Sequence, residues 1–294
     1  MFCVFAALLA GPRAGSAGSA RDYLNAPIDT WLTFYNFAYS SAVTPEEGLD
    51  VTSTARSNVL AQSLVATRTF GVLGRTAGVS AILPYVFIDT DSAAFRASNN
   101  GVSDVGMLWQ INLFGGPALT REQFRSFVPQ TFASFHLAVT TPLGEYQATK
   151  PVNPSANRWM INPTVNLSYT PDRGWTWLET YLGGRVFTPN DNFRVGGASR
   201  LSQKPLLIVE GHASRNVTRR LWLSADAYYH VGGETSIDSV PQGNAANTLR
   251  LGVGMGLTAW AGGDVVLNYE HVVAKPTGQP DAQAIRMYLL NPER

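Results

Sequence analysis

Charged residues are scarce in this chain of 294 residues, and the two signs nearly cancel. Lys and Arg together number 22, and Asp and Glu number 21, which gives a formal net charge of +1 at pH 7. Proteins that bind nucleic acid carry an excess of basic side chains to neutralise phosphates, so this composition argues against a nucleic-acid partner.

Cysteine is almost absent. Cys3 is the single cysteine in the sequence, which excludes a disulfide framework and any Cys-x-x-Cys metal or redox site. The histidines are His136, His212, His230 and His271, and they fall in separate segments without the spacing of metal ligands. The sequence therefore predicts neither a metal nor a cofactor.

Long hydrophobic runs are also missing. No stretch of eighteen apolar residues occurs, so the sequence predicts no membrane-spanning helix. Mean hydropathy is −0.03 although 45% of the residues are hydrophobic. Apolar and polar residues must therefore be interleaved along the chain.

The interleaving is clearest between Gln203 and Thr235. One face of its second half carries Leu221, Leu223, Ala225, Ala227, Tyr229 and Val231, and the other carries Arg220, Trp222, Ser224, Asp226, Tyr228 and His230. A period of two is typical of a β-strand. The first half alternates in the same way, and Asn216-Val217-Thr218 between the halves is short enough for a tight hairpin. These strands exceed the usual five or six residues and carry charges of both signs on one face, which indicates a transmembrane β-barrel with a polar lumen.

Similar alternation along the rest of the chain predicts about twelve strands. They cover residues 30–40, 57–70, 75–87, 104–114, 130–141, 159–169 and 175–187, the two arms of 203–235, and residues 249–259, 265–273 and 284–290. Long connectors near 41–56, 88–103, 142–158, 188–202, 232–247 and 274–283 alternate with short ones, as extracellular loops and periplasmic turns do in outer-membrane barrels. The connector from Gly115 to Phe124 is suited to a short helix. We predict an all-β fold, a transmembrane antiparallel up-and-down β-barrel, with a soluble β-sandwich as the alternative.

The N-terminus has the pattern of a secretory signal. Residues 1–20 contain an apolar core followed by small residues, and the pattern predicts cleavage after Ala20, although the usual basic start is lacking. A buried N-terminal strand is the alternative. We expect residues 21–29 to form a periplasmic or plug segment and residues 30–294 to form the barrel.

Several segments resemble a family of bacterial outer-membrane proteins. They are RDYLNAP near the start, RSNVLAQSLVATRTF, GRTAGVSAILPY, the P-x-GEY…K…N…NRW block at 142–159, and the hairpin KPLLIVEGHASRNVTRRLWLSADAYYHVGGET. These resemble the transporters of the meta-pathway of phenol degradation over nearly all of residues 21–290. The resemblance implies an outer-membrane barrel that takes up aromatic or other hydrophobic compounds. The implied partners are outer-membrane lipids and lipopolysaccharide, the barrel-assembly machinery and a small solute. One difference is the C-terminus, YLLNPER, which lacks the terminal aromatic residue common in such barrels.

Alternation assigns a set of charged and aromatic residues to the lumen. The candidate solute path consists of Glu179, Arg185, Glu210, His212, Arg220, Trp222, Asp226, Tyr228, Arg250 and Glu270. Pairing of opposite charges inside the barrel is the structural alternative, because unpaired charges in a narrow lumen are costly. If the set lines a path, its aromatic rings and arginines suit a small hydrophobic or aromatic solute, or an anion.

Two other functions stay open. His212 and Ser214 are two residues apart on one face of a strand, as an outer-membrane lipid hydrolase would require. Since Arg215-Asn216 differs from the Asn-Gly that follows the serine in the barrel phospholipase, we predict a protein that is not an enzyme and has no catalytic residues. The third candidate is a structural or surface-interaction barrel without transport. The preferred function is passive uptake through a narrow barrel.

Overall fold

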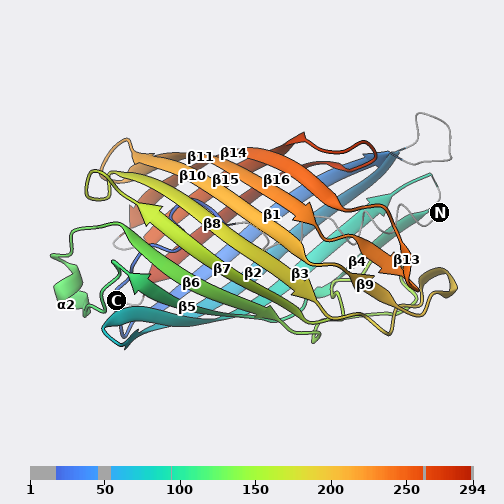
Figure 1. The fold of residues 1–294 in the computed structure, drawn as a ribbon, viewed down its shortest axis with the longest axis horizontal. Coiled ribbons are helices and arrows are strands. Elements are labelled where there is room, and N and C mark those ends of the chain that lie inside the picture. The colour runs from blue at the N-terminus through green and yellow to red at the C-terminus, as the bar shows by residue number, and fades with distance from the viewer. Residues whose placement is uncertain (1–17, 46–53, 94, 261–262, 293–294) are drawn as a thin grey trace.

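Twelve antiparallel strands form a closed barrel in the computed structural model, which describes residues 18–45, 54–93, 95–260 and 263–292 (Figure 1). The strands are β1 (Trp31–Pro45), β2 (Thr54–Val72), β3 (Arg75–Asp91), β5 (Gly106–Phe114), β6 (Phe132–Thr140), β7 (Met160–Tyr169), β8 (Thr176–Phe187), β10 (Leu206–Asn216), β11 (Leu221–Gly232), β14 (Ala246–Trp260), β15 (Gly263–Ala274) and β16 (Asp281–Pro292). Each pairs with the next barrel strand along the chain, and β1 pairs with β16 to close the sheet. The predicted up-and-down barrel is confirmed, and a two-sheet sandwich is excluded.

The two ends of the barrel differ in their connections. At one end, which we call the turn end, short turns join β2 to β3, β7 to β8 and β10 to β11. The predicted short helix lies at this end as α2 (Arg121–Phe124), with Thr120 and Gln123 forming a capping box (Figure 1). Because Leu32 pairs with Pro292, the first and last barrel strands also meet at the turn end. Most of predicted segment 1–20 lies outside the described residues, which begin at Gly18.

The opposite end, which we call the loop end, carries additional strands. These are β4 (Arg96–Val102), β9 (Leu201–Gln203), β12 (Thr235–Ile237) and β13 (Val240–Pro241) (Figure 1). The expected loop at 88–103 is wrong in part, since β3 continues to Asp91 and pairs with β4. This hairpin is rich in Ser, Asn and Asp, so apolar alternation does not mark it. The other three strands form a small sheet from two separate connectors.

Side-chain exposure is inverted relative to a water-soluble barrel. On β14, Val253 points outward and is 59% exposed, whereas Arg250 points inward and is 8% exposed. Large apolar side chains are exposed in this way around the whole outer wall. Among the described residues, no helix is long and apolar enough to cross a membrane. The outer wall therefore forms the apolar belt that a bilayer requires, and the closed ladder pairs the backbone groups within it.

The membrane belt can be tested with two arginine substitutions. Val253 lies at the middle of β14, and Val217 lies in the turn between β10 and β11 at the turn end. We expect V253R to lower the free energy of unfolding by about 2–4 kcal/mol, because a cation at the bilayer midplane is poorly solvated. V217R should cost below about 1 kcal/mol, since that position lies near the interface. Denaturant unfolding in phospholipid vesicles measures both, and equal costs would contradict the assigned belt.

Candidate functional site in the barrel lumen

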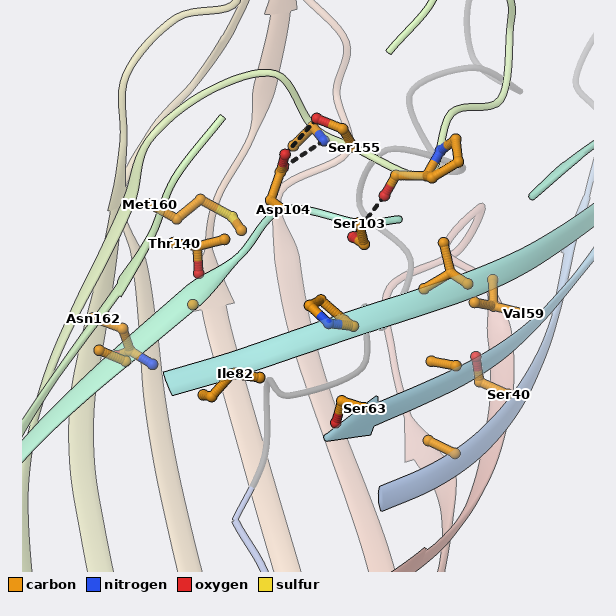
Figure 2. Close-up of a pocket in the computed structure, with 18 of the residues that line it drawn as sticks. Ser40, Val59, Ser63, Ile82, Ser103, Asp104, Thr140, Ser155, Met160 and Asn162 are labelled. Atoms are coloured by element: carbon orange, nitrogen blue, oxygen red, sulfur yellow. Dashed lines mark hydrogen bonds between the residues drawn. The ribbon is translucent and has the colours of Figure 1, made fainter. Parts of the chain in front are cut away.

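A cavity of about 430 Å³ occupies the lumen. On one side its wall consists of the inward faces of β1 to β3. Those of β1 and β2 carry mostly small side chains, which include Ala38, Ser40, Ala42, Ala55, Ser57, Val59, Ala61 and Ser63. Across the cavity lie Thr140 of β6 and Met160 and Asn162 of β7 (Figure 2). The space exists because most inward residues of β1 and β2 are too short to reach across the barrel.

The connector 142–158 borders the cavity at the loop end. It is a connector without helix or strand, as the sequence predicts. In addition, Val152, Ser155, Ala156 and Arg158 are buried, and Lys150 to Ala156 line the cavity. No sequence signal indicates this packing, because the segment is rich in Pro and Asn and lacks alternation.

One buried carboxylate holds this connector in place. Asp104, between β4 and β5, accepts hydrogen bonds from the backbone nitrogens of Gly144 at 3.1 Å and Ala156 at 2.7 Å, and from the hydroxyl of Ser155 (Figure 2). Beside it, Ser103 donates to the carbonyl of Pro154 at 2.7 Å. A carboxylate that accepts several hydrogen bonds from one loop fixes that loop strongly. Asp104 therefore fixes the inward position of 142–158.

The small sheet of β9, β12 and β13 contributes to the same end of the cavity. A cluster of buried apolar residues supports it, formed by Phe193, Val195, Ala198, Leu201 and Ile237. Phe193 and Leu201 also line the cavity. Outside this cluster, hydrogen bonds from the Ser199 hydroxyl and the backbone of Ser199 and Arg200 hold the pKa of the Asp238 carboxyl below its ordinary value. These contacts fix two connectors to each other over the loop end.

Residues 18–30, the N-terminal segment, lie inside the barrel toward the turn end. Gly18, Ser19, Asp22 and Tyr23 border the cavity. The ring of Tyr23 lies 3.8 Å from that of His136 on β6, centroid to centroid. The segment thus separates the cavity from part of the turn end.

Several wall contacts hold the N-terminal segment. The guanidinium of Arg21 donates to Ser214 Oγ at 2.8 Å and Asn216 Oδ1 at 2.6 Å on β10. Farther along, Asn112 of β5 donates to the side chain of Asn25 at 2.8 Å. Contacts to strands on different sides of the barrel keep the segment across the lumen.

The inward faces of β7 to β16 carry most of the charge. His212 Nδ1 lies 2.7 Å from Asp226 Oδ1, and Asp226 also accepts from Ser224. Glu270 forms ion pairs with Arg250, whose Nη1 lies 2.9 Å from Oε1, and with Arg286, whose Nη2 lies 3.1 Å from Oε2. These groups pair with one another within the wall, as charges of low exposure must.

The ten residues of the predicted solute path are distributed unevenly. Seven are buried within the polar wall: Glu179, Glu210, His212, Asp226, Tyr228, Arg250 and Glu270. Arg185 and Trp222 are half-buried, and Trp222 lies beneath Arg21 with 5.0 Å between the guanidinium carbon and the ring centroid. Arg220 is exposed in the turn after β10, at the rim. Of the ten, Glu210 borders the cavity in the described part of the lumen.

The residues around the cavity were largely missed by sequence reasoning. Small inward residues on β1 and β2 carry no charge or ring, so they gave no signal of a site. Their alternation with Tyr35, Phe37 and Tyr39 did predict the strand itself. A run of serine and alanine on one face was the available signal for free space. Among the described residues, no group of three or more His, Cys, Asp or Glu side chains is arranged to hold a metal ion.

This combination of a closed twelve-stranded wall, an apolar outer belt and a polar lumen defines a β-barrel of the outer-membrane type. The model of the family described as "Putative MetA-pathway of phenol degradation" matches residues 40–279, and the chain belongs to that family. No curated protein sequence matches the chain.

Solved structures share the barrel. The COG4313 outer membrane channel from Pseudomonas putida F1 is similar with a TM-score of 0.75 and 16% identity, over 94% of this chain and 100% of that one. The transport unit of the autotransporter AIDA-I from Escherichia coli is similar with a TM-score of 0.57 and 12% identity, over 99% and 97% of the two chains. The beta domain of the Bordetella autotransporter BrkA is similar with a TM-score of 0.56 and 10% identity, over 89% of this chain and 98% of that one. The protein is located in the bacterial outer membrane.

The role of Asp104 can be tested by cysteine labelling. We expect A156C to resist a thiol reagent in the otherwise unchanged barrel, because Ala156 is 5% exposed. Adding D104A should make the thiol react at least tenfold faster, since three hydrogen bonds to the connector are lost. L143C, at a position 73% exposed in the same connector, is the matched control and should react rapidly in both backgrounds. Unchanged protection of A156C in the D104A variant would show that other contacts hold the connector.

The charge network yields a prediction of stability. E270Q should lower the free energy of unfolding by about 3 kcal/mol, because the buried Arg250 and the half-buried Arg286 lose the carboxylate between them. Adding R286Q should recover part of that loss. E122Q in the exposed helix α2 is the control and should cost nothing measurable. Equal unfolding midpoints for E270Q and E122Q would mean that lumen water screens the network.

Proposed function

We propose that this protein is an outer-membrane channel for passive uptake of small hydrophobic or aromatic compounds. The observation that carries the proposal is a cavity of about 430 Å³ inside a barrel of the phenol-degradation family. Cavities of roughly 300–1,000 Å³ suit small organic ligands. A phenol-sized solute therefore fits within the enclosed space.

The cavity lining suits a solute of mixed character. Alanine, valine, isoleucine and methionine side chains supply apolar surface, and hydroxyl or amide groups such as Ser63, Thr140 and Asn162 lie between them. Charged side chains, among them Lys150 and Arg286, also border the cavity. Polar groups set in apolar surface orient a ligand. Weak binding favours passage, because a solute must leave as readily as it enters.

In this proposal, residues 21–29 act as the plug. Their contacts with Ser214, Asn216 and Asn112 support that role, because they hold the segment across the lumen. Since nothing in the sequence resembles a nucleotide-binding site, flux follows the concentration gradient. The residues of β8 to β16 that pair with one another then support the wall and the plug, and the solute contacts mainly β1 to β3, β6 and β7.

The geometry does not favour the lipid hydrolase. Both ring nitrogens of His212 face carboxylates, with Nδ1 2.7 Å from Asp226 and Nε2 3.4 Å from Glu210. Ser214 Oγ instead accepts a hydrogen bond from Arg21 Nε. A serine nucleophile needs a base within hydrogen-bond distance, so a non-enzymatic role is the better proposal.

Solute flux into liposomes tests the proposal. Vesicles with the purified protein should take up phenol-like solutes faster than empty vesicles, and deletion of residues 21–28 should raise the flux and the single-channel conductance at least several-fold. A variant with E122Q alone is the control, because Glu122 is exposed in helix α2 and lies outside the plug. Permeability equal to that of empty vesicles, both with and without residues 21–28, would leave the structural barrel as the better account.

A further inference from the structure

We propose that Glu179 is the binding site for the processed amino terminus of this protein. Hydrolysis of the Ala20–Arg21 peptide bond by a signal peptidase consumes one water molecule and yields an Ala20 carboxylate and an Arg21 α-ammonium group. That ammonium group then forms a buried ion pair with Glu179. The inference rests on the expected end of the signal peptide at Ala20 and is independent of which solute crosses the barrel.

The main observation is the position of the Arg21 nitrogen. It lies 2.7 Å from Glu179 Oε2. The other carboxylate oxygen accepts from Ser168 Oγ at 2.9 Å and from the Tyr181 hydroxyl at 3.2 Å. The nitrogen that cleavage would make cationic is therefore already in contact with a carboxylate.

The second observation is the burial of the carboxylate. Glu179 is 3% exposed, and it lies within electrostatic reach of the Arg21 guanidinium and of His212. The groups that donate hydrogen bonds to it are neutral: the Arg21 backbone nitrogen and the hydroxyls of Ser168 and Tyr181. A buried carboxylate is costly unless it is well paired, and an α-ammonium at the Arg21 nitrogen would add a charge and further donors in direct contact with it.

The third observation is the backbone of Arg21. Its φ is 69°, in the left-handed region that side chains other than glycine rarely adopt. The strain arises because the preceding carbonyl crowds the residue. Cleavage removes that carbonyl, so an N-terminal Arg21 keeps the same position without the conflict.

Contacts on the other side of the cleaved bond would remain. The Arg21 guanidinium still binds Ser214 and Asn216, and it lies over the ring of Trp222. These side-chain contacts hold the new terminus beside Glu179. The ion pair would then fix one end of the plug to β8.

A competing start site has its own carboxylate. The repeat AGSAGSA also permits cleavage after Ala17, and the Gly18 nitrogen lies 2.8 Å from Glu210 Oε2. Glu210 already has His212 Nε2 at 3.4 Å. Gly18 also has no side chain to hold a new terminus in place, whereas the Arg21 guanidinium binds Ser214 and Asn216, which favours Arg21 as the mature first residue.

Two measurements on the protein purified from outer membranes test the inference. Mass spectrometry of the intact chain should give Arg21 as its first residue. Acylation by an N-hydroxysuccinimide ester, followed by digestion and mass spectrometry, should then modify the α-amine at least tenfold more slowly in the folded protein than in urea. The exposed amine of Lys204 provides the internal reference.

The variant E179Q should restore rapid acylation of the folded α-amine, and the matched variant E122Q should not. If E179Q does not fold, the comparison of folded and urea-unfolded unmodified protein still decides the question. A mature chain beginning at Gly18 or elsewhere would overturn the inference. An α-amine that reacts equally fast in the folded and unfolded protein would overturn it as well.

Discussion

The hydrocarbon layer of a bilayer offers the protein backbone no hydrogen-bonding partners, and the whole fold follows from that constraint. Every peptide group within the hydrocarbon layer must pair with another, and an antiparallel sheet achieves this only by closing. Pairing of β1 with β16 completes the ring. Closure places one face of every strand against lipid and the other in the lumen, so the period of two in the sequence follows from the barrel. It also brings buried charges together from neighbouring strands.

The lumen is divided by side-chain size. On β8 to β16, long polar side chains reach one another and pair, as Glu270 does with Arg250 and Arg286. On β1 and β2 most inward residues are short, and the cavity lies beside them. One part of the wall thus stabilises the barrel and holds the N-terminal segment, while the other part borders the cavity. In the proposed function, structural and transport roles therefore belong to different strands.

Sequence reasoning predicted the barrel well because each strand carries its own evidence. Alternation in Leu221 to Val231 is a local property, and closure requires no further signal. The cavity could not be predicted in the same way, because it depends on which residues lie opposite each other across the lumen. Asp104 is an example: its role depends on Gly144 and Ala156, which are 40 and 52 residues away. Arg220 shows the opposite problem, since alternation alone placed a rim residue in the lumen.

The central claim is that solute passes through the cavity beside β1 to β3. Neighbouring cysteines on the two faces of β2 test it most directly, because the native Cys3 lies in the predicted signal peptide. S63C places a thiol in the cavity, and L64C places one on the outer wall. The account predicts that a bulky thiol reagent reduces phenol flux in proteoliposomes to the level of empty vesicles for S63C and leaves it unchanged for L64C. Undiminished flux through fully modified S63C would contradict it.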